Sequence, residues 1–215
     1  MIARNMESYN WITLILVVIL VIILIGNKLF PEKFTEFKKI FSSGKYFTSH
    51  QKKPSVFNLF SFILYLAHGF TLSLALFILF KTRAIFDVAY DFIFYLQIFI
   101  ILNILIGIKY LFEKIIASIF SMDNVIDNYI FYKITYKNLL AFSLYPVLLI
   151  VIYTWEPSMN ILILITVLYL ALNLLVLLKY YAKHQKLIYK FSFYFILYLC
   201  SLEIAPYIIL YKVIT

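Results

Sequence analysis

The sequence predicts an all-α membrane protein: a polytopic bundle of about six transmembrane helices, with short interfacial amphipathic helices. The first observation is composition. Of the 215 residues, 65% are hydrophobic, and the mean hydropathy is +0.97, whereas soluble domains are about 45–50% apolar. The second is that the apolar residues form long runs, and the third is that the lysines gather at the ends of those runs. Lipid is the solvent that suits such a chain, and we expect residues 1–215 to form a single membrane domain.

Six apolar runs are predicted to cross the bilayer. Several are near the short end of the roughly 17–25 residues that a spanning helix needs, so their predicted ends carry a margin of several residues. The first run has the length of a signal-peptide core, but the sequence Lys28-Leu29-Phe30-Pro31 follows it instead of a small-residue cleavage site, so we expect it to be retained. The predicted spans are residues 11–26, 56–80, 92–108, 138–155, 161–178 and 191–211.

The distribution of positive charge predicts the orientation of these spans. Of the 19 Lys and Arg residues, 15 lie in the segments that join span one to two, span three to four, and span five to six. Cytoplasmic loops carry the excess of Lys and Arg in membrane proteins, so these three segments are predicted to be cytoplasmic. Six spans then place both termini on the other side of the membrane. In a bacterial inner membrane, that side is the periplasm.

Two of the cytoplasmic segments are predicted to form short amphipathic helices. Pro31 suits the first position of a helix, and Asp123 is a suitable N-cap for a second one. Each helix would collect its apolar residues on one face. Such a helix can lie in the headgroup layer of the membrane, or it can be a docking surface for a cytoplasmic partner. The residues concerned are Phe34, Phe37, Ile40 and Phe41 in the first helix, and Ile126, Tyr129, Ile130 and Lys133 in the second.

Glu203 is the most informative polar residue, because it lies inside the last apolar run. A carboxylate near mid-bilayer is costly unless it is neutralised or paired, so it is a functional-site candidate. At 1.5 Å per residue, His68 lies about 18 Å into span two and Glu203 about 19–20 Å into span six, so they can share one depth. Asn103 and Asn173 also fall in the central third of their spans, and Tyr207 lies one turn from Glu203 on the same helix face.

This predicted polar layer has three interpretations. It can be hydrogen-bonding glue between helices, a proton or ion relay through His68 and Glu203, or a contact between Glu203 and a partner helix. Pro206 adds polarity, because it frees a backbone carbonyl beside Glu203. Pro146 and Pro206 each predict either a kink that packs helices or a broken helix at a binding site. Only four glycines occur in the chain, which favours kinks.

The sequence contains no catalytic signature. A Gly-rich phosphate loop, a His-Glu-x-x-His zinc motif and a nucleophile elbow are all missing from it. Asp87 with Asp91, and Asp123 with Asp127, resemble Mg²⁺-binding pairs, but the predicted topology places the two pairs on opposite sides of the membrane. The lone Cys200 excludes an intramolecular disulfide and a cysteine-rich metal site. We therefore expect no enzymatic activity, no cofactor and, because the lysines cluster at span ends, no nucleic-acid partner.

The last span also carries a distinctive motif, FILYLCSLEIAP at residues 195–206. It closely resembles the C-terminal signature of a Bacteroidota family of polytopic inner-membrane proteins of unknown function. Trp11 and residues 30–34, 46–47 and 131–146 are similar to that family as well, while Ser143 stands where a glycine is expected. The resemblance implies an inner-membrane location and brings no established activity. Restriction to one phylum favours a phylum-specific machine, such as the type 9 secretion and gliding apparatus, as the setting.

These observations favour a non-catalytic subunit or assembly factor of a larger membrane complex, with the lipid bilayer and other integral membrane proteins as partners. The alternative is a small proton- or ion-coupled transporter that uses the intramembrane pair His68 and Glu203.

The topology is directly testable. Because 15 of 19 basic residues mark the cytoplasmic side, we expect reporter fusions at Lys53 and Lys186 to report a cytoplasmic location and a fusion after Thr215 to report a periplasmic one. A cytoplasmic reporter after Thr215 would require an odd number of spans and would refute the scheme.

Overall fold

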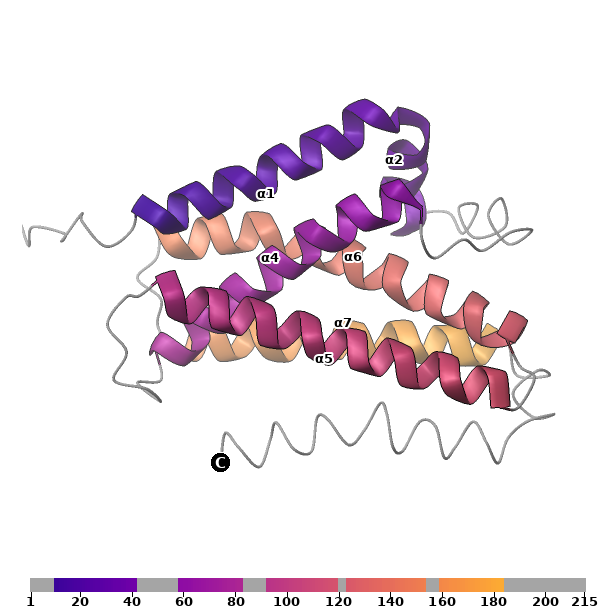
Figure 1. The fold of residues 1–215 in the computed structure, drawn as a ribbon. Helices are drawn as coiled ribbons and strands as arrows, with labels where there is room; N and C mark the ends of the chain where they lie inside the picture. The colour runs from indigo at the N-terminus through magenta and orange to yellow at the C-terminus, as the bar shows by residue number, and fades with distance from the viewer. Residues whose placement is uncertain (1–9, 42–57, 83–91, 120–122, 154–158, 184–215) are drawn as a thin grey trace, which may run out of the picture. The chain divides into compact units, whose positions relative to one another are not determined.

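A computed structural model describes residues 10–41, 58–82, 92–119, 123–153 and 159–183, and these residues form helices (Figure 1). The chain divides into two compact units, Met1–Asn173 and Leu174–Thr215. The packing described below belongs to the first unit. The helices are α1 (Asn10–Leu29), α2 (Pro31–Lys38), the 3₁₀ turn η2 (Lys39–Phe41), α4 (Leu59–Thr82), α5 (Phe92–Ile119), α6 (Asp123–Tyr153) and α7 (Met159–Lys183).

The all-α prediction is confirmed for the described part of the chain. Five of its helices, α1, α4, α5, α6 and α7, are long and apolar enough to cross a membrane. They match the first five predicted spans in order. The sixth predicted span, 191–211, lies outside the described residues.

Two helices differ from their predicted spans at the ends where α5 leads into α6. α5 continues to Ile119 instead of ending near residue 108, and α6 begins at Asp123. The separate surface helix expected from Asp123 is therefore the first part of a single 31-residue helix. The physical reason is that no glycine or proline interrupts residues 123–145, so nothing ends the helix before the apolar run begins.

The amphipathic helix expected from Pro31 is present as α2, which follows directly on the end of α1 (Figure 1). Pro31 begins it, Glu32 lies in its first turn and Lys38 in its last, an order that suits the helix dipole. Its apolar residues do not face lipid, because Phe34 and Phe37 are 2% and 1% exposed. They pack against α4 and α6 in a buried apolar cluster, which we call the inner cluster. The interpretation that this face lies in the headgroup layer is therefore wrong. The cluster consists of Phe34, Phe37, Ile40, Phe60, Leu64, Phe131 and Leu139.

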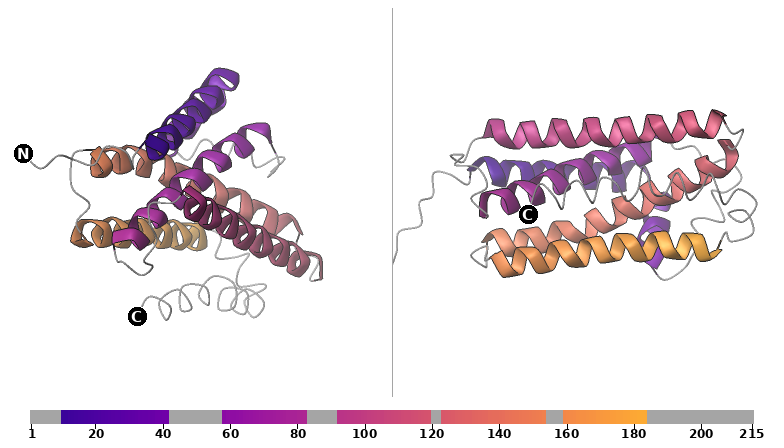
Figure 2. Two further views of the ribbon diagram at one scale, coloured as in Figure 1. Left: turned by 60° about the vertical axis from the view of Figure 1, so that its left-hand side comes forward. Right: turned by 90° about the horizontal axis from the view of Figure 1, so that it is seen from below.

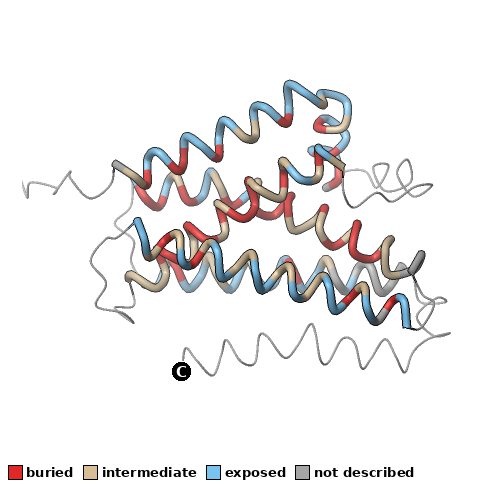
Figure 3. The backbone as a smooth tube through the Cα atoms, viewed as in Figure 1, coloured by how far each residue is buried: buried red, intermediate tan, exposed pale blue. Residues whose placement is uncertain are grey.

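α4 is the central helix of the first unit. It packs against α1, α5 and α6, and it passes between α1 and α5 in two views of the ribbon (Figures 1 and 2). In the most apolar stretch of α4, 50% is buried inside the protein, whereas the buried share of the corresponding stretches of α5 and α7 is 11%. The burial colours show the same contrast, with buried residues concentrated along α4 and on the sides of α1 and α6 that face it (Figure 3).

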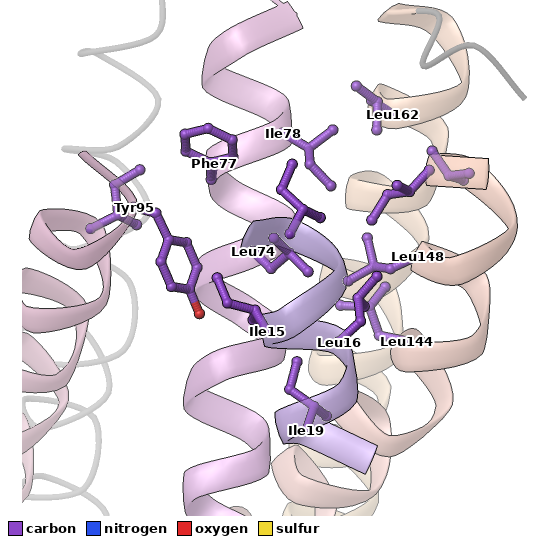
Figure 4. Packing of buried hydrophobic residues seen from close by; sticks show 14 residues of the cluster. Ile15, Leu16, Ile19, Leu74, Phe77, Ile78, Tyr95, Leu144, Leu148 and Leu162 are labelled. Carbon is purple, nitrogen blue, oxygen red and sulfur yellow. The ribbon is translucent and has the colours of Figure 1, made fainter. Parts of the chain in front are cut away.

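A second buried apolar cluster, which we call the outer cluster, includes residues from the second half of α4. α1 contributes Ile12, Ile15, Leu16 and Ile19, whose spacing places them on one helix face. They meet α4 at Leu74, and further residues of α4, α5, α6 and α7 complete the cluster (Figure 4). Dispersion and close fit stabilise such contacts in lipid, because the lipid tails are as apolar as the side chains. The labelled neighbours are Phe77, Ile78, Tyr95, Leu144, Leu148 and Leu162.

Pro146 lies inside α6, and the helix continues on both sides of it. Tyr145, the residue before it, donates a hydrogen bond from its hydroxyl to the carbonyl of Leu16 at 3.0 Å, which ties α6 to α1. Ser143 is exposed and bonds to the Leu139 carbonyl of its own helix. Serine at this position, where the family resemblance suggests glycine, therefore does not prevent close packing of α6 against the described helices.

Gly26 is a position where close packing depends on a missing side chain. A Cβ added there would lie 3.3 Å from Cγ2 of Ile63 on α4. We expect Gly26→Leu to push α1 away from α4 and to lower the unfolding free energy by about 1–3 kcal/mol, the usual cost of overpacking. The measurement is denaturant unfolding followed by circular dichroism in detergent micelles.

Gly107→Leu is the matched control, since a Cβ at Gly107 meets nothing within 4 Å. It should leave stability unchanged or slightly raised, because leucine is the better helix former. Equal losses for both variants would refute the described α1–α4 contact.

Candidate functional site

The polar side chains of α4 lie between the two apolar clusters. His68, Thr71 and Ser73 are all buried there, between Leu64 of the inner cluster and Leu74 of the outer one. Polar groups buried at membrane depth need hydrogen-bond partners, because lipid supplies none. The partners of Thr71 and Ser73 come from α4 itself and from α5.

Asn103 is the main polar residue on the α5 side of this layer. Its amide oxygen accepts a hydrogen bond from the Tyr65 hydroxyl of α4 at 2.9 Å, and its amide nitrogen donates to the Phe99 carbonyl at 2.7 Å. Gly69 makes room for this contact, since a Cβ there would lie 3.4 Å from the Phe99 ring and 3.5 Å from Asn103 Oδ1. The Phe70 and Phe99 rings stack beside it with centroids 4.5 Å apart.

The hydroxyl residues of α4 mostly bond within their own helix. Thr71 donates to the Ala67 carbonyl at 2.7 Å, and Ser73 donates to the Gly69 carbonyl at 2.8 Å. Ser73 Oγ also lies 3.3 Å from the Tyr95 hydroxyl of α5. These bonds satisfy the hydroxyls and join α4 to α5, which is the behaviour of interhelical glue.

His68 lies on the same stretch of α4 and is 4% exposed. Its Nε2 atom is buried and has no hydrogen-bond partner among the described residues. The Tyr65 ring is edge-on to the imidazole at 6.3 Å between centroids, and the positive charge of Lys137 on α6 acts on it. Asn138, the next residue of α6, is also 4% exposed, and its Oδ1 atom is likewise buried without a partner.

The predicted layer is therefore only partly assembled in the described structure. His68 and Asn103 are both buried or half-buried on facing helices, but the group that reaches Asn103 is Tyr65. Asn173 uses its amide within α7, where it donates to the Tyr169 carbonyl at 2.8 Å. The remaining predicted candidates, Glu203, Pro206 and Tyr207, lie outside the described residues.

A buried ion pair between α5 and α6 was not predicted from the sequence. Lys133 Nζ of α6 lies 2.5 Å from Glu113 Oε1 of α5, and their side chains are 8% and 3% exposed. Lys133 also lies over the Tyr129 ring, 5.2 Å from its centroid. Nearer the connection between the two helices, Lys114 pairs with Asp127, and both of these side chains are more exposed.

The signal that could have identified this pair was present in the sequence. Glu113 is the only acidic residue between positions 92 and 122. A carboxylate within a largely apolar stretch is the same criterion that selected Glu203. The predicted third span ends at residue 108, however, and this places Glu113 in a loop.

The polar groups of this region pair mainly across helix–helix contacts. The described residues contain no group of three or more His, Cys, Asp and Glu side chains that could hold a metal ion. Glu113 pairs with Lys133 between α5 and α6, and Tyr65 bonds to Asn103 between α4 and α5. His68 and Asn138 are the two buried groups of this region with an atom still to be satisfied.

The two ion pairs give a stability prediction. Glu113→Leu removes the carboxylate that pairs with the buried Lys133 charge, so we expect the unfolding free energy to fall by about 3–5 kcal/mol. Asp127→Leu breaks the more exposed pair and should cost about 0.2–1 kcal/mol. Unfolding in a mixed-micelle titration, followed by circular dichroism, measures both.

The charge-swapped variant Glu113→Lys with Lys133→Glu should recover much of the loss, because it restores opposite charges at the same two positions. A swap no better than Glu113→Leu, or equal effects of Glu113→Leu and Asp127→Leu, would contradict the buried pairing.

Comparison with known proteins gives one family match. A family model described as a domain of unknown function, DUF4271, matches residues 12–214, nearly the whole chain. No curated protein and no solved structure matches the chain. The uncharacterised membrane-protein family expected from the sequence is confirmed to that extent: the chain belongs to the DUF4271 family.

Proposed function

We propose that this protein is a non-catalytic subunit or assembly factor of a larger complex in the bacterial inner membrane. The observation that supports this role best is an exposed apolar stripe at the cytoplasmic end of α5. We call it the α5 stripe, and it consists of Ile108, Leu111, Phe112, Ile115 and Ile119.

The length of α5 takes this stripe to the edge of the membrane and beyond. α5 has 28 residues, which is about 42 Å at 1.5 Å per residue, while the hydrocarbon core is about 30 Å thick. An average tilt of about 20° shortens the helix by only about 3 Å along the membrane normal. If Phe92 lies at the outer boundary, the core ends near Phe112. The second half of the α5 stripe then lies among the headgroups or in the cytoplasm.

The α5 stripe cannot turn inward without breaking the ion pairs. Its residues are 45–68% exposed, whereas Glu113 and Ala117, on the other face of the helix, are buried. Glu113 pairs with Lys133 and Lys114 with Asp127, and these two pairs fix the rotation of α5 relative to α6. An exposed apolar patch outside the hydrocarbon core is typical of a protein–protein contact. A helix of another membrane protein, packed along α5, is the partner that fits it.

The setting follows from the charge distribution and the resemblance. The cytoplasmic ends of the described helices are rich in lysine, which supports an inner-membrane protein with both termini in the periplasm. The similarity of the FILYLCSLEIAP motif to a Bacteroidota family favours a phylum-specific machine, such as the type 9 secretion and gliding apparatus, as the complex.

The test replaces apolar surface with polar surface on the α5 stripe. Leu111→Gln, Phe112→Gln and Ile115→Gln together should leave the helix content and membrane insertion intact, because these side chains touch no core. We expect the variant to purify alone in mild detergent, whereas the wild type purifies with its partner at a fixed stoichiometry. Native mass spectrometry measures that stoichiometry.

The control variant carries Glu32→Gln and Glu36→Gln, which change exposed polar residues of α2 on the same side of the membrane. It should keep the complex. A wild-type protein that purifies only as a monodisperse homo-oligomer, or a stripe variant that keeps its partner, would contradict the subunit role.

The alternative function is a small proton- or ion-coupled transporter that uses His68 and Glu203. The unpartnered, buried Nε2 atom of His68 is the observation that favours it. Glu203→Gln separates the two functions, because it keeps hydrogen-bonding capacity but removes the titratable proton. A fully assembled but inactive Glu203→Gln protein would favour the transporter.

A further inference from the structure

We propose that the contact between α4 and α6 contains a binding site for one water molecule, which bridges His68 Nε2 and Asn138 Oδ1 and lies beside Lys137. This inference is independent of the subunit role, since it concerns groups in the interior of the bundle. It assigns a ligand to the two buried atoms of the polar layer that the helix packing leaves unsatisfied.

The two atoms need a partner that the described protein does not supply. His68 and Asn138 are each 4% exposed, and both Nε2 and Oδ1 are fully shielded and unpartnered. A buried polar group without a hydrogen bond destabilises the folded protein by the full free energy of its desolvation. Bound water, with two to four hydrogen bonds to groups of this kind, is the usual remedy in protein interiors.

Three observations place the two residues at one level of the α4–α6 contact. The charge of Lys137 acts on the His68 ring, and Asn138 directly follows Lys137. Leu64, one turn before His68, shares the inner apolar cluster with Leu139, which directly follows Asn138. His68 and Asn138 therefore lie at about the same height along the contact between α4 and α6.

The chemistry of the site selects the ligand. The amide oxygen of Asn138 only accepts hydrogen bonds, whereas a neutral imidazole nitrogen accepts or donates according to its tautomer. The ligand must therefore donate to Asn138 and pair with His68 in either sense. The nearby ammonium group of Lys137 disfavours a metal cation, and the Asn138 oxygen disfavours an anion. A neutral group that both donates and accepts, and that fits between two packed helices, is water.

The position of Lys137 gives this water a consequence. Lys137 is half-buried, and it lies on α6 one turn beyond Lys133 of the cytoplasmic ion pair. A water that lies beside Lys137 and hydrogen-bonds His68 Nε2 gives the buried imidazole a partner with which it can exchange its ring proton.

The experiment detects that water at His68 in lipid vesicles. His50→Gln and His184→Gln leave His68 as the only histidine, since the chain has three. Proton-detected solid-state NMR of the ¹⁵N-histidine-labelled protein then reports on one imidazole. We expect a cross-peak between water and the His68 Nε2 position. In addition, Asn138→Leu should abolish the cross-peak while the protein keeps its helical circular dichroism spectrum.

Asn173→Leu is the matched control, because Asn173 is also a buried asparagine but bonds within its own helix. It should leave the cross-peak unchanged. Asn138→Ser, which keeps a small hydrogen-bonding group and should keep the cross-peak, covers the case in which Asn138→Leu fails to fold. A folded protein with no water cross-peak, a direct His68–Asn138 hydrogen bond in its place, or a cross-peak that survives in folded Asn138→Leu would overturn the proposal.

Discussion

The packing of α4 against three other helices is the constraint on which the described structure depends. α1, α5 and α6 all contact it, and the inner and outer apolar clusters each include α4 residues. In lipid this arrangement cannot depend on the exclusion of water from apolar side chains, so it depends on close fit and on hydrogen bonds. Gly26 and Gly69 supply the fit toward α1 and α5, and the Tyr65–Asn103 contact supplies a hydrogen bond toward α5.

Charge is arranged on the same principle. Buried charges are tolerated where the end of α5 packs against the beginning of α6, because Glu113 and Lys133 neutralise each other. That pairing also fixes which face of α5 remains exposed, and the exposed face is apolar from Ile108 to Ile119. The interior accounts for stability, and the outer face of α5 is where function is proposed. His68 and Asn138 are exceptions, since the packing of the described residues leaves one buried polar atom of each unsatisfied.

Apolar runs were sufficient to predict five of the described helices, because a span needs only length and hydrophobicity. They could not locate the start of α6, since Asp123, Lys133 and Lys137 look like loop residues until their partners are known. Periodicity predicted the apolar face of α2 but not what covers it, because lipid and protein impose the same spacing. Of the candidate site, His68 and Asn103 were predicted, whereas Asn138 and Lys133 matter only through residues that are distant in sequence.

The most direct test of the central claim is disulfide formation between α1 and α4 in native membranes. In a Cys200→Ser background, Gly26→Cys with Ile63→Cys places two thiols at neighbouring positions of α1 and α4, since a Cβ on Gly26 would lie 3.3 Å from Cγ2 of Ile63. The account predicts rapid, nearly complete cross-linking on mild oxidation. The control pair, Gly107→Cys with Ile63→Cys, should stay reduced. Absence of the first disulfide, or equal yields from both pairs, would contradict the placement of α4 at the centre of the bundle.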